Sequence, residues 1–281
     1  MNTGSNEIER VPTLSREQCK EILAGETSRP IVLTEETKEW KARSRWSLAS
    51  FKQRFGGDSL ILTDDLGNAT QFKKRPLAEY IDYVQSPEQH SLGQIAPGIR
   101  WYAGFYSPFS LHPELLEEFQ APTCIDNWFR FLQAGMDEWY IRGFGWLLIG
   151  PSGTKSAAHF DLFDTHAWTA QLEGRKRFFL YEPDRSDPYN RDVDAALQRP
   201  LYETVLNTGE LLIIPNNWCH AAVSLEPSMT LTFNFLNETN FGPFLKSLYE
   251  DRNKWESKFA ADDLRMKLGM PPKSSTTAKA V

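Results

Sequence analysis

Hydrophobic and polar positions alternate over short stretches in the middle of the chain, a pattern typical of half-buried β-strands. The alternation covers residues 167–172 and resumes at 177–181. Between these stretches, residues 173–176 contain a glycine and predict a hairpin turn. Further short apolar runs, each preceded by turn-forming residues, occur at 211–215, 221–225 and 229–235. The middle of the chain is therefore predicted to be a core of short strands.

Both flanks of this region have helical spacing mixed with a few strands. Ser15 followed by Gln18 predicts a helix over residues 15–24 that begins with a capping box. Further predicted helices cover 46–55, 76–84 and 112–119. Strands are predicted at 30–34, 59–63 and 101–106, and a long strand pair or one bent strand at 139–150.

This organisation predicts a single large β domain over residues 13–240, with its core at about 97–240, followed by a helical segment over 241–270. The helical segment places Phe244, Leu248, Trp255 and Phe259 on one face. That face either packs on the chain's own β core, which we favour, or forms a homodimer interface. Residues 1–12 are expected to be a disordered lead-in, 185–200 a polar insertion and 271–281 a flexible tail.

Composition restricts the classes of function. The 281 residues are 41% hydrophobic and 13% aromatic, enough for a sizeable core, and the formal net charge of −6 argues against a nucleic-acid binder. Three widely spaced cysteines and a polar N-terminus indicate a reducing, cytoplasmic setting with no secretory signal. Since no run of about 18 apolar residues occurs, no membrane span is predicted.

The strongest chemical signal is His159-Phe160-Asp161, with His220 far downstream. Residues i and i+2 of a strand point to the same side, so His159 and Asp161 can reach one ion, with His220 as the third ligand. Two histidines and one carboxylate form the facial triad that binds iron(II) in non-haem oxygenases.

The surrounding residues resemble the JmjC members of the cupin superfamily, and most of all the lysyl-hydroxylase-like branch related to Jumonji domain-containing protein 6. The similarity covers roughly residues 97–242 and rests on several short motifs and Pro215. The motifs are His159-Phe160-Asp161, Thr165-x-Ala167-Trp168, Gly174-Arg175-Lys176-Arg177, Gly209-Glu210, Trp218-x-His220, Thr232-x-Asn234-Phe235 and Thr239-Asn240-Phe241. The resemblance implies a mainly β fold with added helices: a double-stranded β-helix (jelly roll) with N-terminal α/β additions and C-terminal helices.

The resemblance also implies roles for individual residues. His159, Asp161 and His220 match the iron ligands. Four further positions match residues that hold the cosubstrate 2-oxoglutarate in this family: Lys176, Thr232, Tyr102 and Asn234.

The chain departs from the related branch at residues that are expected to border the active site. Thr169 departs from the asparagine of the related branch, so that branch's substrate is not carried over. The expected substrate pocket includes Asp164, His166 and Trp168, together with parts of residues 86–106 and 185–200. Asp164 either faces a cationic substrate group or is a solvated turn residue.

The resemblance implies an enzyme that uses iron(II), 2-oxoglutarate and O2 to hydroxylate an amino-acid side chain, free or in a peptide or protein, with release of succinate and CO2. Two alternatives stay open: a hydroxylase of a small metabolite, and a metal-binding cupin without oxygenase activity. Such cupins commonly use a His-x-His motif, which does not occur in this sequence. Lys176 further favours the oxygenase, since a cupin that binds no 2-oxoglutarate does not need it.

Overall fold

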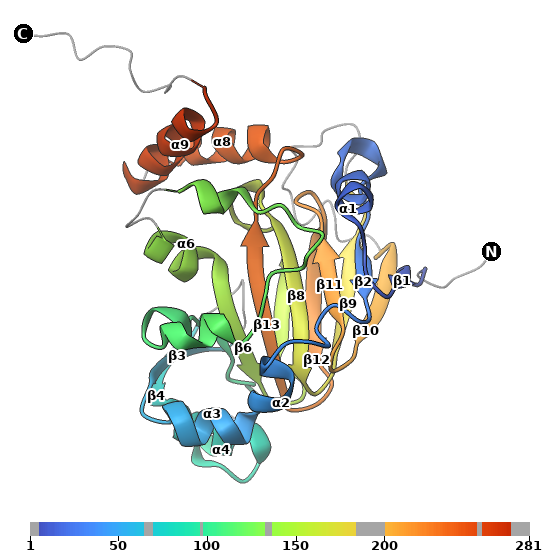
Figure 1. The fold of residues 1–281 in the computed structure, drawn as a ribbon. Coiled ribbons are helices and arrows are strands. Elements are labelled where there is room, and N and C mark those ends of the chain that lie inside the picture. Colours follow the sequence, from blue (N-terminus) through green and yellow to red (C-terminus); the bar gives the residue numbers. More distant parts are fainter. Residues whose placement is uncertain are drawn as a thin grey trace, which may run out of the picture.

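The computed structural model describes residues 6–64, 70–95, 98–132, 137–183, 200–251 and 255–270. Two sheets face each other and form the body of the molecule (Figure 1). The larger sheet has the strand order β1-β2-β11-β8-β13-β6-β5. Its strands are β1 (Arg10–Val11), β2 (Ile31–Leu33), β5 (Ala103–Tyr106), β6 (Gly145–Gly150), β8 (His166–Glu173), β11 (Leu211–Ile214) and β13 (Ser228–Phe235).

The smaller sheet has the order β10-β9-β12-β7, and all of its strand pairs are antiparallel. Its strands are β7 (Lys155–His159), β9 (Lys176–Tyr181), β10 (Tyr202–Leu206) and β12 (Cys219–Ser224). Together the two sheets confirm the predicted double-stranded β-helix. The predicted polar insertion at 185–200 lies almost wholly outside the described residues.

The turn between β8 and β9 differs from the predicted hairpin. β8 pairs with β11 and β13 in the larger sheet, whereas β9 pairs with β10 and β12 in the smaller one. The chain therefore crosses from one sheet to the other at Gly174, which has a φ of +73°. In a jelly roll, short connections of this kind join strands of opposite sheets, and local turn chemistry does not distinguish them from hairpins.

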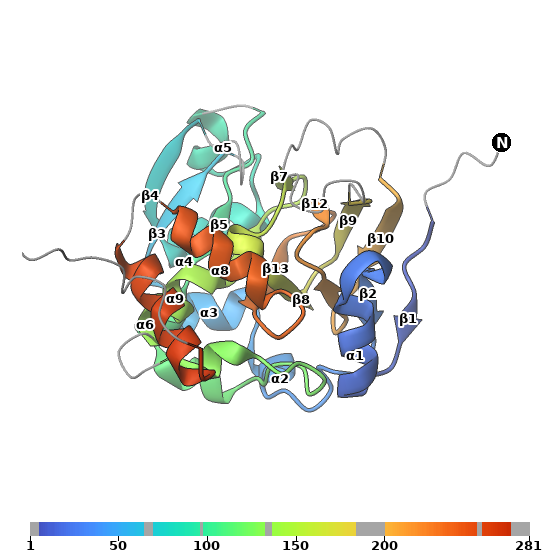
Figure 2. The same ribbon diagram turned by 90° about the horizontal axis from the view of Figure 1, so that it is seen from above.

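N-terminal elements cover one edge and one face of the larger sheet (Figures 1 and 2). Helix α1 (Arg16–Leu23) begins with the predicted Ser15–Gln18 capping box. The other helices of this region are α2 (Ala42–Arg45), α3 (Leu48–Phe55), α4 (Leu77–Gln85) and α5 (Ser91–Ile95), and the strands β3 (Ser59–Thr63) and β4 (Phe72–Pro76) form a separate hairpin. Residues 6–11 belong to the fold rather than to a disordered lead-in: Ile8 is buried and β1 pairs with β2.

Two further segments differ from their predictions. Residues 139–150, predicted as a long strand pair or one bent strand, lie in helix α6 (Asp137–Phe144) and in β6, which follows it. The segment predicted as a helix at 112–119 is the short 3-10 turn η3 (Pro113–Glu117). Other 3-10 turns are η1 (Gly25–Thr27), η2 (Pro108–Ser110), η4 (Trp128–Phe131) and η5 (Leu162–Asp164).

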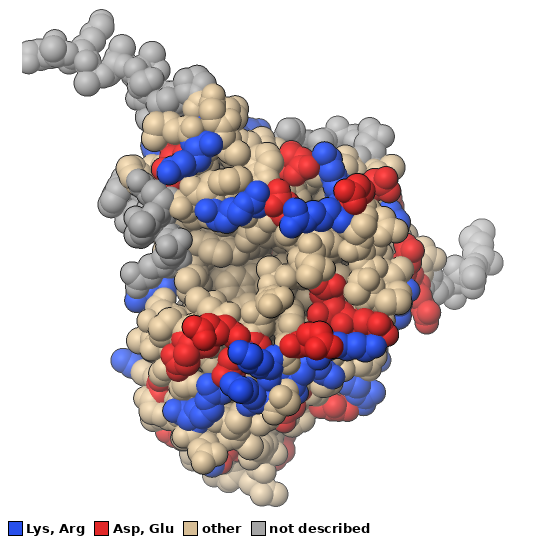
Figure 3. Space-filling view, in the orientation of Figure 1, with Lys and Arg blue, Asp and Glu red and all other residues tan. Residues whose placement is uncertain are grey.

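The C-terminal segment forms the helices α8 (Phe241–Glu250) and α9 (Trp255–Lys267). Phe244 and Leu248 are fully buried in a small second core that includes Phe129 and Phe144, as expected if this face packs on the chain itself. Phe259 is 44% exposed. None of the described helices combines the length and apolar character needed to cross a bilayer. On the face shown in Figure 3, acidic and basic side chains are interspersed, in keeping with the modest net charge.

Candidate active site

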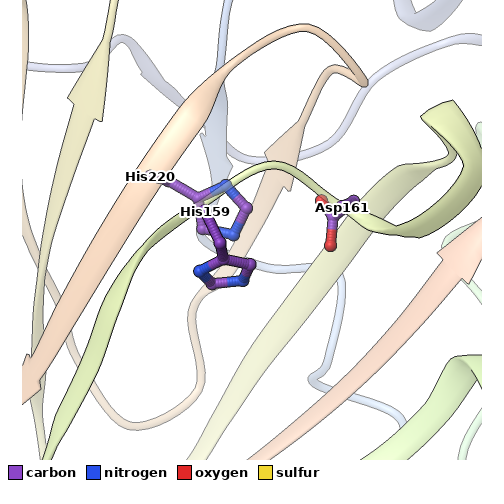
Figure 4. Close-up of side chains that lie close together, drawn as sticks. All are labelled: His159, Asp161 and His220. Atoms are coloured by element: carbon purple, nitrogen blue, oxygen red, sulfur yellow. The ribbon is translucent and has the colours of Figure 1, made fainter. Parts of the chain in front are cut away.

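His159, Asp161 and His220 converge between the two sheets (Figure 4). His159 is the last residue of β7, and its Cα lies opposite that of His220 in the antiparallel β12. The ladder shifts register between His220 and Ala222. Asp161 follows β7 by two residues and begins the η5 turn. One potential ligand atom from each of the three side chains lies within 4.8 Å of the other two.

Hydrogen bonds at the two histidines leave one nitrogen of each ring available for a metal. The Nδ1 atom of His159 lies 2.7 Å from the carbonyl oxygen of Ala157, and that of His220 lies 3.1 Å from the carbonyl oxygen of Trp218. A carbonyl oxygen only accepts, so in both rings Nδ1 carries the proton and Nε2 keeps its lone pair. Such outer hydrogen bonds are what orient histidine ligands in metal sites.

Asp161 is the candidate for the negatively charged ligand. Its Oδ2 atom is buried and has no hydrogen-bond partner among the described residues. A buried carboxylate oxygen without a partner is unfavourable in an apolar setting unless a cation or donor binds it. The donor set of two imidazoles and one carboxylate therefore fits a divalent transition metal such as iron(II).

Burial and the neighbouring His159 imidazole lower the pKa of His220 to about 4, although the carboxylate of Asp161 acts in the opposite direction. At neutral pH the His220 ring is therefore uncharged, which is the form that binds a metal.

A cavity of about 270 Å³ opens beside the three side chains, between the two sheets. Lys176, Thr232 and Asn234 line this cavity together with His159, Asp161 and His220. The structure thus brings six of the seven residues predicted to bind iron or cosubstrate to one space. The seventh, Tyr102, is not part of the lining and contacts the cavity through Lys176.

Lys176 is the cationic residue of this cavity. Its side chain is almost fully buried, at 2% exposure, and its Nζ atom donates a hydrogen bond to the Tyr102 hydroxyl at 2.8 Å. The same Nζ atom lies 5.2 Å from the centre of the Tyr102 ring. Because an ammonium group buried among apolar residues is unfavourable without an anion, this arrangement is suited to an anionic ligand.

Thr232 and Asn234 are two residues apart on β13 and both reach the cavity. The Thr232 hydroxyl donates to the carbonyl oxygen of Trp168 at 3.0 Å, and the Asn234 amide donates to the Thr165 hydroxyl at 2.8 Å. Thr232 keeps its oxygen lone pairs for a ligand, since its single proton is already donated.

The three residues predicted to form a substrate pocket do not line the cavity. His166 and Trp168 alternate along β8 with the lining residues Ala167 and Thr169, so they point to the opposite face of the sheet. Trp168 stacks on Phe233, with ring centres 5.4 Å apart, in the main hydrophobic core.

His166 has a structural set of contacts. Its Nδ1 atom accepts the backbone N–H of Asn216 at 3.0 Å, so Nε2 carries the proton and donates it to the Thr239 hydroxyl at 2.8 Å. Burial lowers the pKa of His166 to about 3, so the ring is neutral.

Asp164 points toward helix α8 instead of the cavity. Its carboxylate accepts a hydrogen bond from the Ser247 hydroxyl, and its carbonyl oxygen accepts one from the Asn240 amide at 3.0 Å. Phe163 and Asp164 both have left-handed backbone conformations, with φ of 53° and 54°. For residues other than glycine this conformation costs about 1–2 kcal/mol each.

The remainder of the cavity wall consists mainly of apolar and small side chains. Among them, the sequence interpretation included only Thr169 and the segment that contains Gly104 and Phe105. Those from the larger sheet and its edge are Gly104, Phe105, Trp146, Leu148, Ala167, Thr169 and Ile214, and those from the β7–η5 segment and the smaller sheet are Ser156, Phe160, Leu162, Phe178 and Ala222. The alternation of side chains along each strand could have identified some of them. Positions 167 and 169 share one face of β8, and positions 232 and 234 share one face of β13.

Comparison with known proteins supports this arrangement. A family model described as a JmjC domain matches residues 131–241, a range that contains all three metal-ligand candidates, Lys176, Thr232 and Asn234. Over these residues the chain is similar to JmjC domains. The matched range spans β6 to β13, which supply most of the cavity wall, whereas Gly104 and Phe105 come from β5, outside the match.

Several relatives of this chain have informative names. Over 244 residues it is 25% identical to "Lysine-specific demethylase JMJ21" of Arabidopsis thaliana, covering 77% of this chain and 24% of that protein. Over 288 residues it is 22% identical to "2-oxoglutarate and iron-dependent oxygenase JMJD4" of Gallus gallus, covering 89% and 66%. Over 238 residues it is 21% identical to "Bifunctional arginine demethylase and lysyl-hydroxylase psr-1" of Caenorhabditis elegans, covering 75% and 56%. The chain thus spans between a quarter and two thirds of the length of these relatives.

Proposed function

We propose that this JmjC protein is an iron(II)- and 2-oxoglutarate-dependent oxygenase that hydroxylates a C–H bond of an amino-acid side chain. The observation that carries the proposal is the shared cavity: the unpartnered Asp161 oxygen and two correctly protonated histidines at one side, and the buried Lys176 ammonium on another part of the wall. The names of the JMJD4 and psr-1 relatives support iron, 2-oxoglutarate and a protein side chain as the reactants.

Each residue has a defined task in this proposal. His159, Asp161 and His220 would hold iron(II) on one face and leave the opposite positions open. Lys176, supported by Tyr102, would bind the distal carboxylate of 2-oxoglutarate, with the Thr232 hydroxyl beside it. When bound, iron(II) and 2-oxoglutarate supply the oxidation, in which one oxygen atom of O2 enters the substrate and the other enters succinate as CO2 leaves. The apolar wall keeps bulk water away from the reacting groups.

Anaerobic titration with iron(II) and 2-oxoglutarate tests the proposal directly. The wild-type protein is expected to develop the visible metal-to-ligand charge-transfer band of a chelated 2-oxoglutarate. His159→Ala should abolish the band, because one of three ligands is lost, whereas the control variant His90→Ala should retain it. Wild-type protein that binds metal but shows no band would contradict the oxygenase function and favour a metal-binding cupin.

Lys176→Ala tests the cosubstrate end of the same cavity. Loss of a charge-assisted contact worth about 2–3 kcal/mol should raise the 2-oxoglutarate concentration needed for half of the band by about 30–150-fold. Lys155→Ala, which removes an exposed lysine from β7, is the matched control and should leave the titration unchanged. Equal titrations of the two variants would exclude Lys176 as the carboxylate-binding residue.

Assembly and location are proposed on narrower grounds. Phe259 and Met266 of α9 are 44% and 55% exposed, and a homodimer through α8 and α9 would cover them. Light scattering on the wild type and on Met266→Glu would detect the dimer and its loss.

Cys19, Cys124 and Cys219 are all buried free thiols, which supports a cytoplasmic, reducing location. Fractionation of cells that express the tagged protein would test the location.

A further inference from the structure

The turn that follows Asp161 is held in a conformation that its residues do not prefer. Phe163 and Asp164 are adjacent non-glycine residues with φ of 53° and 54°, within three residues of the metal-ligand candidate. Strained backbone of this kind persists only where the surrounding structure determines it, and it gathers at functional sites. The contacts that enforce the turn are therefore of interest.

Helix α8 and the residue directly before it each donate a hydrogen bond to Asp164. The Asn240 amide, fully buried just before the helix, donates to the Asp164 carbonyl oxygen at 3.0 Å, and the Ser247 hydroxyl donates to the Asp164 carboxylate. The Phe163 ring packs against Phe144, with ring centres 6.2 Å apart, in the core that α8 shares. Figures 1 and 2 show α8 directly after β13, at the end of the larger sheet.

The other end of the turn is anchored to the sheet. The Thr165 hydroxyl donates to the carbonyl oxygen of Leu162 at 2.7 Å and in turn accepts the amide of Asn234 at 2.8 Å. Asp161 comes directly before Leu162, and its Oδ2 atom has no hydrogen-bond partner within the described parts of the chain. The position of that oxygen therefore depends on the backbone of the turn.

We propose that Ser247 and Asn240 of the C-terminal segment are positioning residues for the metal site, acting on Asp161 through Asp164. This inference rests on the proposed function, since it assumes that Asp161 binds a metal. It assigns α8 a role beyond packing: the helix fixes the geometry of the carboxylate ligand from outside the JmjC β core. Loosening the contact should weaken metal binding without unfolding the protein.

The matched pair Ser247→Ala and Ser257→Ala tests the inference. Ser257, on α9, also donates from a helix serine to an aspartate, Asp251 at 2.8 Å, but it does not contact the turn. Manganese(II) binding to the metal-free protein, followed by the electron paramagnetic resonance signal of free Mn²⁺, is the readout. Ser247→Ala should weaken Mn²⁺ binding by about 10-fold, as loss of outer contacts does in other metal sites. Ser257→Ala should bind like wild type, and Ser247→Thr, which keeps the hydroxyl, should restore binding.

Asp164 variants separate positioning from charge. Asp164→Asn keeps an acceptor oxygen and tolerates the left-handed conformation, so it should bind Mn²⁺ nearly like wild type, whereas Asp164→Ala should be weakened about 10-fold. The double variant Ser247→Ala/Asp164→Ala should bind Mn²⁺ no more weakly than Asp164→Ala alone, because the two substitutions remove the same hydrogen bond. Melting temperatures of the metal-free variants check that each is folded.

The outcomes distinguish this inference from the function on which it rests. Wild-type Mn²⁺ affinity retained in Ser247→Ala and Asp164→Ala, or effects that simply add in the double variant, would overturn the positioning role and leave the oxygenase proposal intact. Failure of the wild type itself to bind Mn²⁺ would contradict the proposed function instead.

Discussion

Lys176 combines two demands that normally conflict. Its ammonium group lies at 2% exposure beside Tyr102, which is favourable for binding an anion and unfavourable for the stability of the protein without one. Binding sites often retain such unfavourable groups because function requires them. Replacing Lys176 with an uncharged residue should therefore raise the stability of the ligand-free protein and lower its affinity for the cosubstrate.

Lys176→Met should make this opposition measurable. The methionine keeps most of the apolar stem and removes the buried charge, so without 2-oxoglutarate the free energy of unfolding should rise by about 1–3 kcal/mol. The same variant should lose the stabilisation that 2-oxoglutarate gives the wild type in the presence of metal. Urea unfolding with and without 2-oxoglutarate measures both effects, with the exposed Lys155→Met as control. A variant less stable than wild type in the absence of ligand would contradict the reasoning.

At the scale of elements, strand β8 shows what sequence patterns could and could not predict. Capping residues identified α1, and the His159, Asp161 and His220 motif identified the metal-ligand candidates, because both signals are local or chemically specific. In β8, positions 166–172 are all buried, since one face lines the cavity and the other packs in the core. The alternation over residues 167–172 therefore does not separate a buried face from an exposed one in this strand. It could not show that His166 and Trp168 point away from the cavity.

The connection from β8 to β9 depends on a glycine at position 174. Gly174 has a φ of +73°, and a Cβ atom built on it would lie 2.2 Å from the carbonyl oxygen of Pro227. Gly174→Ala should therefore lower the free energy of unfolding by about 2–5 kcal/mol, combining the left-handed penalty with overpacking. Gly57→Ala is the control, because a Cβ there meets nothing within 4 Å. Chemical denaturation of both variants measures the difference, and equal stabilities would show that the crossing tolerates a side chain.

For the whole molecule, the buried histidine His166 links folding to pH. Burial lowers its pKa from the ordinary value of 6.5 to about 3. As the pH falls below 6.5, His166 becomes protonated in the unfolded chain but stays neutral in the folded protein. The stability associated with this residue is therefore complete above pH 6.5 and is lost progressively down to pH 3.

Comparison of wild type with His166→Gln isolates this contribution. Between pH 6 and 4 the wild-type free energy of unfolding should fall more steeply than that of the variant, by up to about 1.4 kcal/mol per pH unit. The glutamine variant is expected to be less stable at neutral pH, because the contacts to Asn216 and Thr239 are altered. Urea unfolding in metal-free buffer across this range gives the two slopes. Parallel slopes would show that His166 is not the residue responsible.

Strand β7 lies at the edge of the smaller sheet, paired on one side with β12. Edge strands open more readily than central ones, yet β7 ends with His159 and leads directly to Asp161, while His220 lies on β12. A metal bound by His159, Asp161 and His220 would cross-link β7 to β12, much as a disulfide would. Amide hydrogen exchange in β7 should then slow sharply on metal loading and little elsewhere, so that the catalytic ion also completes the architecture of the barrel.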